Sequence, residues 1–153
     1  MHYQHILGAT DFSELGDLAL RRAAELAAAA GSSLTALTVL PQPEIPSPLI
    51  SHYDVHVGKE QRERALAAAR DALEARIPEE IRASGLPIHY EVRIGDPTDE
   101  ILLADAELEP ELIVLATHGR RGWQRFIMGS VAERVVQFAR ADVLAVRGRP
   151  ASA

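Results

Sequence analysis

Short apolar runs alternate with longer segments of helical periodicity along this chain, and the alternation strongly constrains its fold. The run Leu112–Ala116 is wholly apolar, which is typical of a central strand buried on both faces. Strands separated by helices, in the order βαβαβαβαβ, predict a parallel sheet with right-handed crossovers, a doubly wound α/β fold with helices on both faces. The expected strands are His5–Ala9, Ser33–Leu40, Ile88–Ile94, Leu112–Ala116 and residues 143–146.

Glycines and prolines predict where the helices begin and end. The first helix is expected to begin at Ser13 and to end at Gly31, because glycine readily adopts the left-handed conformation of a C-cap. A long helix is expected over about residues 58–76, with a kink or restart at Pro78. The proline-rich stretch 41–57 is interpreted as a linker.

Composition limits the class of protein. The 153 residues fit a single domain, 1–153, and the absence of cysteine excludes disulfides and thiol catalysis. The net charge of −6 argues against general nucleic-acid binding, because phosphate-rich polymers select basic surfaces. No apolar run is long enough to cross a bilayer, and the first residues do not have the pattern of a signal peptide. We therefore expect a cytoplasmic protein with neither nucleic-acid binding nor membrane insertion.

Ligands of doubly wound folds bind beyond the carboxyl ends of the strands. Here those ends are residues 9–11, residues 39–41 and the loop that follows Ala116. That loop contains glycines, and Ser130 with Glu133 three residues later has the spacing of a capping box at a helix start. A helix N-terminus beside a glycine can form an anion site. The alternative is that these residues form only a glycine turn into a capped helix and bind no ligand. Neither a P-loop nor a dinucleotide fingerprint is present.

The loop resembles the nucleotide-binding motif of the universal stress protein family, which is Gly, two residues, Gly, nine residues, and Gly-Ser or Gly-Thr. Gly119 matches the second glycine, nine residues separate it from Gly129, and Ser130 follows. Ala116 stands at the place of the first glycine and adds one methyl group there. The likeness extends over nearly the whole chain, including the opening segment 9–13 (ATDFS) and a GDP turn at residues 95–97.

The resemblance implies a five-stranded sheet of order 3-2-1-4-5 with ATP or AMP at its carboxyl edge. By this analogy Asp11 would hold the ribose, Ala9 and Thr10 would line the base pocket, and the backbone of Val39 would bind adenine. Mg²⁺ or Mn²⁺ could accompany the nucleotide, held mostly by phosphate oxygens and water. Gly119, Gly129, Ser130 and Val131 would bind the phosphates, and Ala116 would lie beside the ribose or the α-phosphate. His118 and Arg120 complete the predicted nucleotide-binding residues, Arg120 as a positive charge near the phosphates.

Some of these residues have a structural alternative. Asp11 and Glu14 also have capping-box spacing, so Asp11 is predicted to cap the first helix, and separate oxygens would permit both roles. His118 would contact a phosphate or simply be solvated. His52 and His56 have the i, i+4 spacing of a metal pair, but no HExxH pattern accompanies them, and no metal site is predicted.

The last strand would lie at the edge of the proposed sheet, where an apolar strand invites pairing with another chain. The resemblance implies a homodimer formed through residues 143–147, and coverage of this edge by the tail 148–153 is the alternative.

Three functional hypotheses follow. The first is an ATP- or AMP-binding regulatory protein of the stress response that acts on an unidentified protein partner. The second is a dimeric interaction module that has lost nucleotide binding, and Ala116 favours it. The third is a slow ATPase. No catalytic residue is predicted and an enzyme is not expected, because the loop contains no carboxylate to position water or hold a metal.

Overall fold

The computed structural model describes residues 2–42, 52–118 and 128–148, and of residues 52–57 only the backbone. All the predicted strands are present, and the last begins one residue earlier than expected, at Asp142. The elements are β1 (His5–Ala9), α1 (Glu14–Ala30), β2 (Ser33–Leu40), α2 (His52–Arg76), α3 (Glu79–Arg82), β3 (Ile88–Ile94), α4 (Pro97–Leu108), β4 (Leu112–Ala116), α5 (Ser130–Phe138) and β5 (Asp142–Val146).

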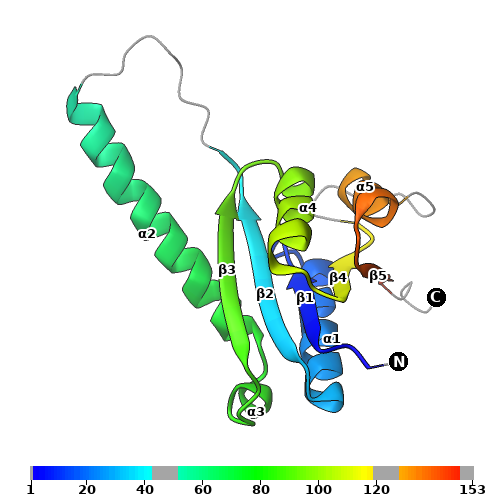
Figure 1. Ribbon diagram of the computed structural model, residues 1–153. Helices are drawn as coiled ribbons and strands as arrows, with labels where there is room; N and C mark the ends of the chain where they lie inside the picture. The colour runs from blue at the N-terminus through cyan, green and yellow to red at the C-terminus, as the bar shows by residue number, and fades with distance from the viewer. Residues whose placement is uncertain (1, 43–51, 119–127, 149–153) are drawn as a thin grey trace, which may run out of the picture.

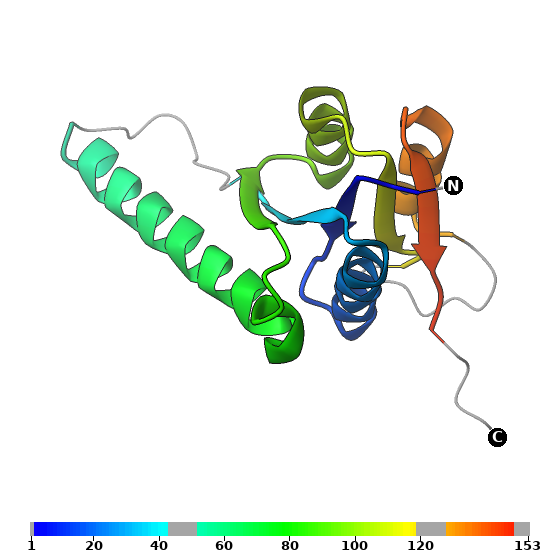
Figure 2. The same cartoon turned by 60° about the horizontal axis from the view of Figure 1, so that its bottom comes forward.

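The strands form one parallel sheet in the order β3-β2-β1-β4-β5, which confirms the predicted doubly wound α/β fold (Figure 1). Leu7 of β1 lies opposite Thr35 of β2 on one side and Ile113 of β4 on the other. Helices α1, α2 and α3 cover one face of the sheet, and α4 and α5 cover the other (Figure 2). β5 lies at one edge, as predicted.

Each face of the sheet has its own hydrophobic core. Successive side chains of a strand point to opposite faces, so Ile6 packs in the core beneath α1 whereas Leu7 packs in the core beneath α4 and α5. The core beneath α1 requires a close approach at Gly8, where an added Cβ would lie 2.6 Å from Cβ of Ala23. This glycine therefore sets how closely α1 packs on β1.

The start of α1 corrects the predicted cap. Ser13, not Asp11, is the N-cap, because its hydroxyl accepts the N–H of Gly16 at 3.0 Å. Asp11 instead accepts two hydrogen bonds from Ser13, one from its backbone N–H at 3.0 Å and one from its side-chain hydroxyl. The end of the helix is as predicted, with Gly31 as a left-handed C-cap at φ 68°.

The long helix α2 begins earlier than the sequence indicated. It starts at His52, so the interpretation of all of 41–57 as a linker was wrong. Its C-terminal part is anchored by the fully buried Leu73, while its N-terminal part extends away from the sheet (Figure 1). The predicted interruption at Pro78 is confirmed, since α3 begins one residue later. No described helix is both long and apolar enough to cross a membrane.

Candidate functional site

A cavity of about 530 Å³ lies at the carboxyl ends of β1, β2 and β4, where the topology rule places ligands. It is lined by segments that are far apart in the sequence and that meet only because the strands are parallel neighbours. Gly119 and Arg120 lie outside the described residues. All the other predicted site residues line the cavity: Ala9, Thr10, Asp11, Val39, Ala116, His118, Gly129, Ser130 and Val131.

Part of the cavity wall is apolar, and the sequence analysis did not assign it. Leu37 could have been found, because it lies two residues before Val39 on β2 and so on the same face of the sheet. Ile101 could have been found as well, because it lies in the first turns of α4, and in a parallel sheet a helix that follows a strand begins at the carboxyl edge. The missed lining residues are Gly16, Leu37, Pro97, Ile101, Leu115, Thr117 and Ala132.

The turn between β1 and α1 forms a polar side of the cavity. Hydrogen bonds to β2 fix the main chain of Thr10: its N–H donates to the Leu37 carbonyl at 3.0 Å, and its own carbonyl accepts the Thr38 hydroxyl at 2.8 Å. Asp11 follows, and Gly16 packs directly beneath it. An added Cβ at Gly16 would lie 2.5 Å from Oδ1 of Asp11, so this turn requires glycine there.

The other side of the cavity is formed by the two ends of the β4–α5 loop. The backbone N–H of Gly129 donates to the Thr117 carbonyl at 2.7 Å, and the Thr117 N–H donates to the Val146 carbonyl at 2.9 Å. These bonds fix the start of α5 against the end of β4. Ala116 lines the cavity and also packs against the core beneath α1, so its methyl group contributes to packing.

The start of α5 differs from the predicted capping box. Gly129 is the N-cap and Ser130 is the first helical residue, so the assignment of Ser130 as N-cap was wrong. The first intrahelical bond runs from the Glu133 N–H to the Gly129 carbonyl, at 2.9 Å. The amides of residues 130–132 therefore have no acceptor within the helix itself, and these residues line the cavity. The positive end of the helix dipole favours an anion here.

Ionisable side chains are few in the described lining. Asp11 is its carboxylate and His118 its imidazole, with Nδ1 of His118 3.0 Å from the Thr117 hydroxyl. The described residues contain no group of three or more side chains able to hold a metal ion. The metal pair considered at His52 and His56 involves side chains outside the described set.

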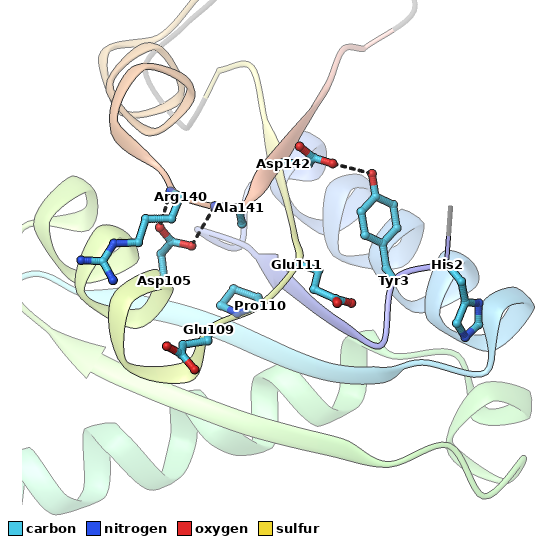
Figure 3. A pocket seen from close by; sticks show the side chains of 9 residues that line it. All are labelled: His2, Tyr3, Asp105, Glu109, Pro110, Glu111, Arg140, Ala141 and Asp142. Atoms are coloured by element: carbon cyan, nitrogen blue, oxygen red, sulfur yellow. Dashed lines mark hydrogen bonds between the residues drawn. The ribbon is translucent and has the colours of Figure 1, made fainter.

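A second cavity, of about 450 Å³, lies at the amino edge of the same sheet (Figure 3). Its polar side chains bind the chain's own groups: Asp105 accepts the backbone N–H of Arg140 at 2.7 Å and that of Ala141 at 3.3 Å. Tyr3 donates its hydroxyl to Oδ2 of Asp142 at 3.0 Å, as Figure 3 shows. This hydrogen bond, with desolvation and the nearby carboxylates, raises the pKa of Tyr3.

A model of the universal stress protein family matches residues 2–147. Universal stress protein A homolog 1 of Coxiella burnetii is 29% identical over 155 aligned positions, which cover 95% of this chain and 97% of that protein. Universal stress protein MJ0531 of Methanocaldococcus jannaschii is 41% identical over 63 residues, which cover 41% of this chain and only 37% of that protein.

Two solved structures share the fold. The structure of the hypothetical protein MJ0577, from Methanocaldococcus jannaschii, superposes with a TM-score of 0.80 at 22% identity and covers 99% of this chain and 100% of its own. The universal stress protein of Archaeoglobus fulgidus in complex with dAMP superposes with a TM-score of 0.57 at 25% identity, over 95% of this chain and 98% of that one.

Proposed function

Because the chain belongs to the universal stress protein family, we propose that it binds an adenine nucleotide, ATP or AMP, in the cavity at the carboxyl edge of its sheet. The observation that carries the proposal is the meeting of residues 9–11, Val39 and residues 129–131 around one cavity of about 530 Å³. A volume of this size lies within the range of small-molecule sites.

The two ends of the cavity suit the two ends of a nucleotide. The apolar wall of Leu37, Ile101 and Leu115 suits the faces of a purine, and the backbone of Val39 is the proposed partner of its edge. The Asp11 carboxylate can accept hydrogen bonds from ribose hydroxyls. The amides and the hydroxyl at the start of α5 suit the phosphates, whose charge the helix N-terminus favours.

The complex of the Archaeoglobus fulgidus protein with dAMP supports an adenine nucleotide as the ligand. Ala116 narrows the cavity by one methyl group relative to a glycine, and that methyl also packs against the core, so we propose that it is accommodated. We propose that Mg²⁺ or Mn²⁺ accompanies the nucleotide, held mostly by phosphate oxygens and water.

We further propose a regulatory role in the stress response, in which nucleotide occupancy is sensed by a protein partner, without catalysis. Phosphoryl transfer needs a group that positions the attacking water near the terminal phosphate. In the proposed orientation Asp11, the carboxylate of the described lining, lies at the ribose and not at the phosphates.

Equilibrium dialysis of the purified protein against labelled ATP with Mg²⁺, competed with AMP and with GTP, tests the ligand. Saturable binding near one nucleotide per chain, displaced by AMP but not by GTP, is the expected result. Absence of binding at high micromolar ATP would overturn the proposal and favour the interaction module without a nucleotide. Release of phosphate during the incubation would favour the slow ATPase.

We also propose a homodimer through β5. This strand lies at an edge of the sheet, and its Leu144 side chain is 41% exposed. Unpaired strand edges with apolar side chains pair readily with another copy. Analytical ultracentrifugation should give a dimer for the wild type and a monomer for Leu144→Lys, while a monomeric wild type would refute the assignment.

A further inference from the structure

The turn that carries Asp11 is connected to the C-terminal end of α2, a helix that contributes no described residue to the cavity. The connection starts at Thr10, which lines the cavity and donates its hydroxyl to Oδ1 of Asp17 at 3.0 Å. The same oxygen accepts Nε–H of Arg76, the last residue of α2, at 2.8 Å. Three residues from separate elements are thus joined through one carboxylate oxygen.

A second contact joins Arg76 to the same turn. Its guanidinium lies over the ring of Phe12, with Cζ 4.3 Å from the ring centroid. Phe12 has φ 62°, a left-handed conformation that costs an aromatic residue free energy, which its contacts must offset. The Phe12 N–H donates to the Thr10 hydroxyl at 3.0 Å, so the same hydroxyl is tied both to Phe12 and, through Asp17, to Arg76.

These contacts involve the two chain neighbours of Asp11, Thr10 and Phe12. The main chain of Thr10 is fixed by β2, whereas the left-handed turn at Phe12 depends on the Thr10 hydroxyl and on the ring contact. A change at Phe12 would rotate the peptide that follows Asp11 and move its carboxylate. Arg76 itself is held in place, because its Nη1 donates to the Ala72 carbonyl of the preceding helical turn at 2.9 Å.

We propose that Arg76 is a positioning residue of the nucleotide site, which holds the β1–α1 turn, through Asp17 and Phe12, in the conformation that presents Asp11 to the ribose. This inference rests on the proposed function. The side chains of Arg76 and Asp17 are 30% and 34% exposed, so their ion pair is screened by solvent and contributes little to global stability. Its effect should therefore be larger on nucleotide affinity than on the melting temperature.

The chain offers a matched control for Arg76 on the same helix. Arg70 also lies over an aromatic ring, with Cζ 5.9 Å from the centroid of Tyr90, and its Nη1 donates to the Tyr90 carbonyl at 3.2 Å. Tyr90 is on β3, at the opposite edge of the sheet from β5, and does not line the cavity. Arg70→Met thus removes a similar cation–π contact and the same charge without touching the turn.

The test is isothermal titration of AMP into the wild type, Arg76→Met and Arg70→Met. Arg76→Met should weaken AMP binding about tenfold, as do substitutions that act on a site without touching the ligand, while Arg70→Met should bind as the wild type does. Arg76→Lys keeps a cation near Phe12 and should restore part of the affinity. Equal affinity of Arg76→Met and the wild type, or equal losses in the two methionine variants, would overturn the inference.

Hydrogen exchange supplies a readout that needs no nucleotide. In the peptide covering residues 10–16, Arg76→Met should speed amide exchange, and Arg70→Met should not. If the wild type binds no nucleotide, the proposed function fails. Unchanged amide exchange in Arg76→Met would refute the positioning role, whatever the titration shows. Should Arg76→Met not fold, Asp17→Ala, which removes the oxygen shared by Thr10 and Arg76, carries the same comparison, and wild-type exchange and affinity in that variant would refute the positioning role.

Discussion

The two ends of the sheet carry cavities of similar volume but opposite character. At the carboxyl edge, parallel strands end together and their connections diverge, which leaves an apolar wall, the turn with Asp11 and the start of α5 around one space. At the amino edge, three of the carboxylates accept hydrogen bonds from the chain itself: Asp105 from two backbone amides, Asp142 from Tyr3 and Glu111 from the Gln4 N–H.

This difference is the reason for proposing the ligand site at the carboxyl edge and not at the amino edge. What distinguishes the carboxyl edge is that its polar groups belong to a turn and a helix start aimed at the same space, beside an apolar wall that a planar base can cover. At the amino edge Asp105, Asp142 and Glu111 bond to the chain's own groups, and at the carboxyl edge Asp11 does so too, through Ser13; the difference lies in the apolar wall and the start of α5 beside Asp11. The predictions below test this division of roles.

The largest effect is expected from Gly129→Val. An added Cβ would lie 3.1 Å from the Thr117 carbonyl oxygen, and the larger valine would displace the start of α5 from the end of β4. ATP binding should weaken by roughly a hundredfold or more, equivalent to losing two charge-assisted hydrogen bonds of about 1.5 kcal/mol each. Equilibrium dialysis measures it, with circular dichroism to show that the fold is retained.

Gly58→Val is the control for Gly129→Val. Gly58 lies on the exposed part of α2 and has no atom within 4 Å of an added Cβ. This variant should bind ATP as the wild type does. If Gly129→Val bound ATP with wild-type affinity, the start of α5 would not be part of the nucleotide site.

A smaller effect on the same edge is expected from Gly16→Ala. The new methyl would lie 2.5 Å from Oδ1 of Asp11 and 2.9 Å from the Thr10 hydroxyl, so the turn must shift. We expect a destabilisation of about 1–3 kcal/mol, typical of overpacking, together with weaker AMP binding. Urea unfolding and calorimetry measure the two, and Gly58→Ala should lower neither. A Gly16→Ala protein with unchanged affinity would mean that Asp11 does not contact the nucleotide.

A substitution at the amino edge should lower the free energy of unfolding and leave nucleotide affinity unchanged. Asp105 is 3% exposed and is the acceptor for the Arg140 and Ala141 amides. Asp105→Ala removes both acceptors and should lower the free energy of unfolding by about 1–3 kcal/mol, the cost of leaving buried donors unpaired. AMP affinity of the folded variant should equal that of the wild type. A loss of affinity larger than any loss of stability would contradict the division between the two edges.

The sequence predicted the fold well because its information was periodic and local. The apolar run at Leu112–Ala116 and the alternation at Ile88–Ile94 depend only on neighbouring residues, and both strands occur as predicted. The strand order and the site residues came instead from resemblance to a family. Parallel pairing joins residues such as Leu37 and Glu91, far apart in the chain, and a single sequence does not encode such partners visibly.

The errors lie where tertiary contacts outweigh local spacing. Ser130 and Glu133 have the spacing of a capping box, but the bond from Gly129 to Thr117 starts the helix one residue earlier. Asp11 had the spacing of a cap, yet the left-handed turn at Phe12 moves that role to Ser13. Arg76 gave no sequence signal at all, because its partners are distant in the chain.

The smallest effect is expected at Tyr3 in the amino-edge cavity. The hydrogen bond to Asp142, followed by desolvation and the charges of Asp142 and Glu111, raises the pKa of Tyr3 above 10.0. Because the folded state favours the protonated phenol, this contribution to stability is present below the unfolded pKa of about 10. It is lost as the pH rises through the folded-state value.

Asp142→Asn removes the charged acceptor and should bring the pKa of Tyr3 back toward its ordinary value, without altering AMP affinity. Phenolate absorbance against pH measures the shift, and Tyr3→Phe identifies the part of the titration that belongs to this residue. The Tyr3→Phe variant is needed because burial raises the pKa of Tyr90 as well, and the two phenols must be told apart. If Asp142→Asn instead changed AMP binding, the two edges would be coupled through β5, whose Val146 carbonyl bonds to Thr117 at the cavity, and the division of roles would fail.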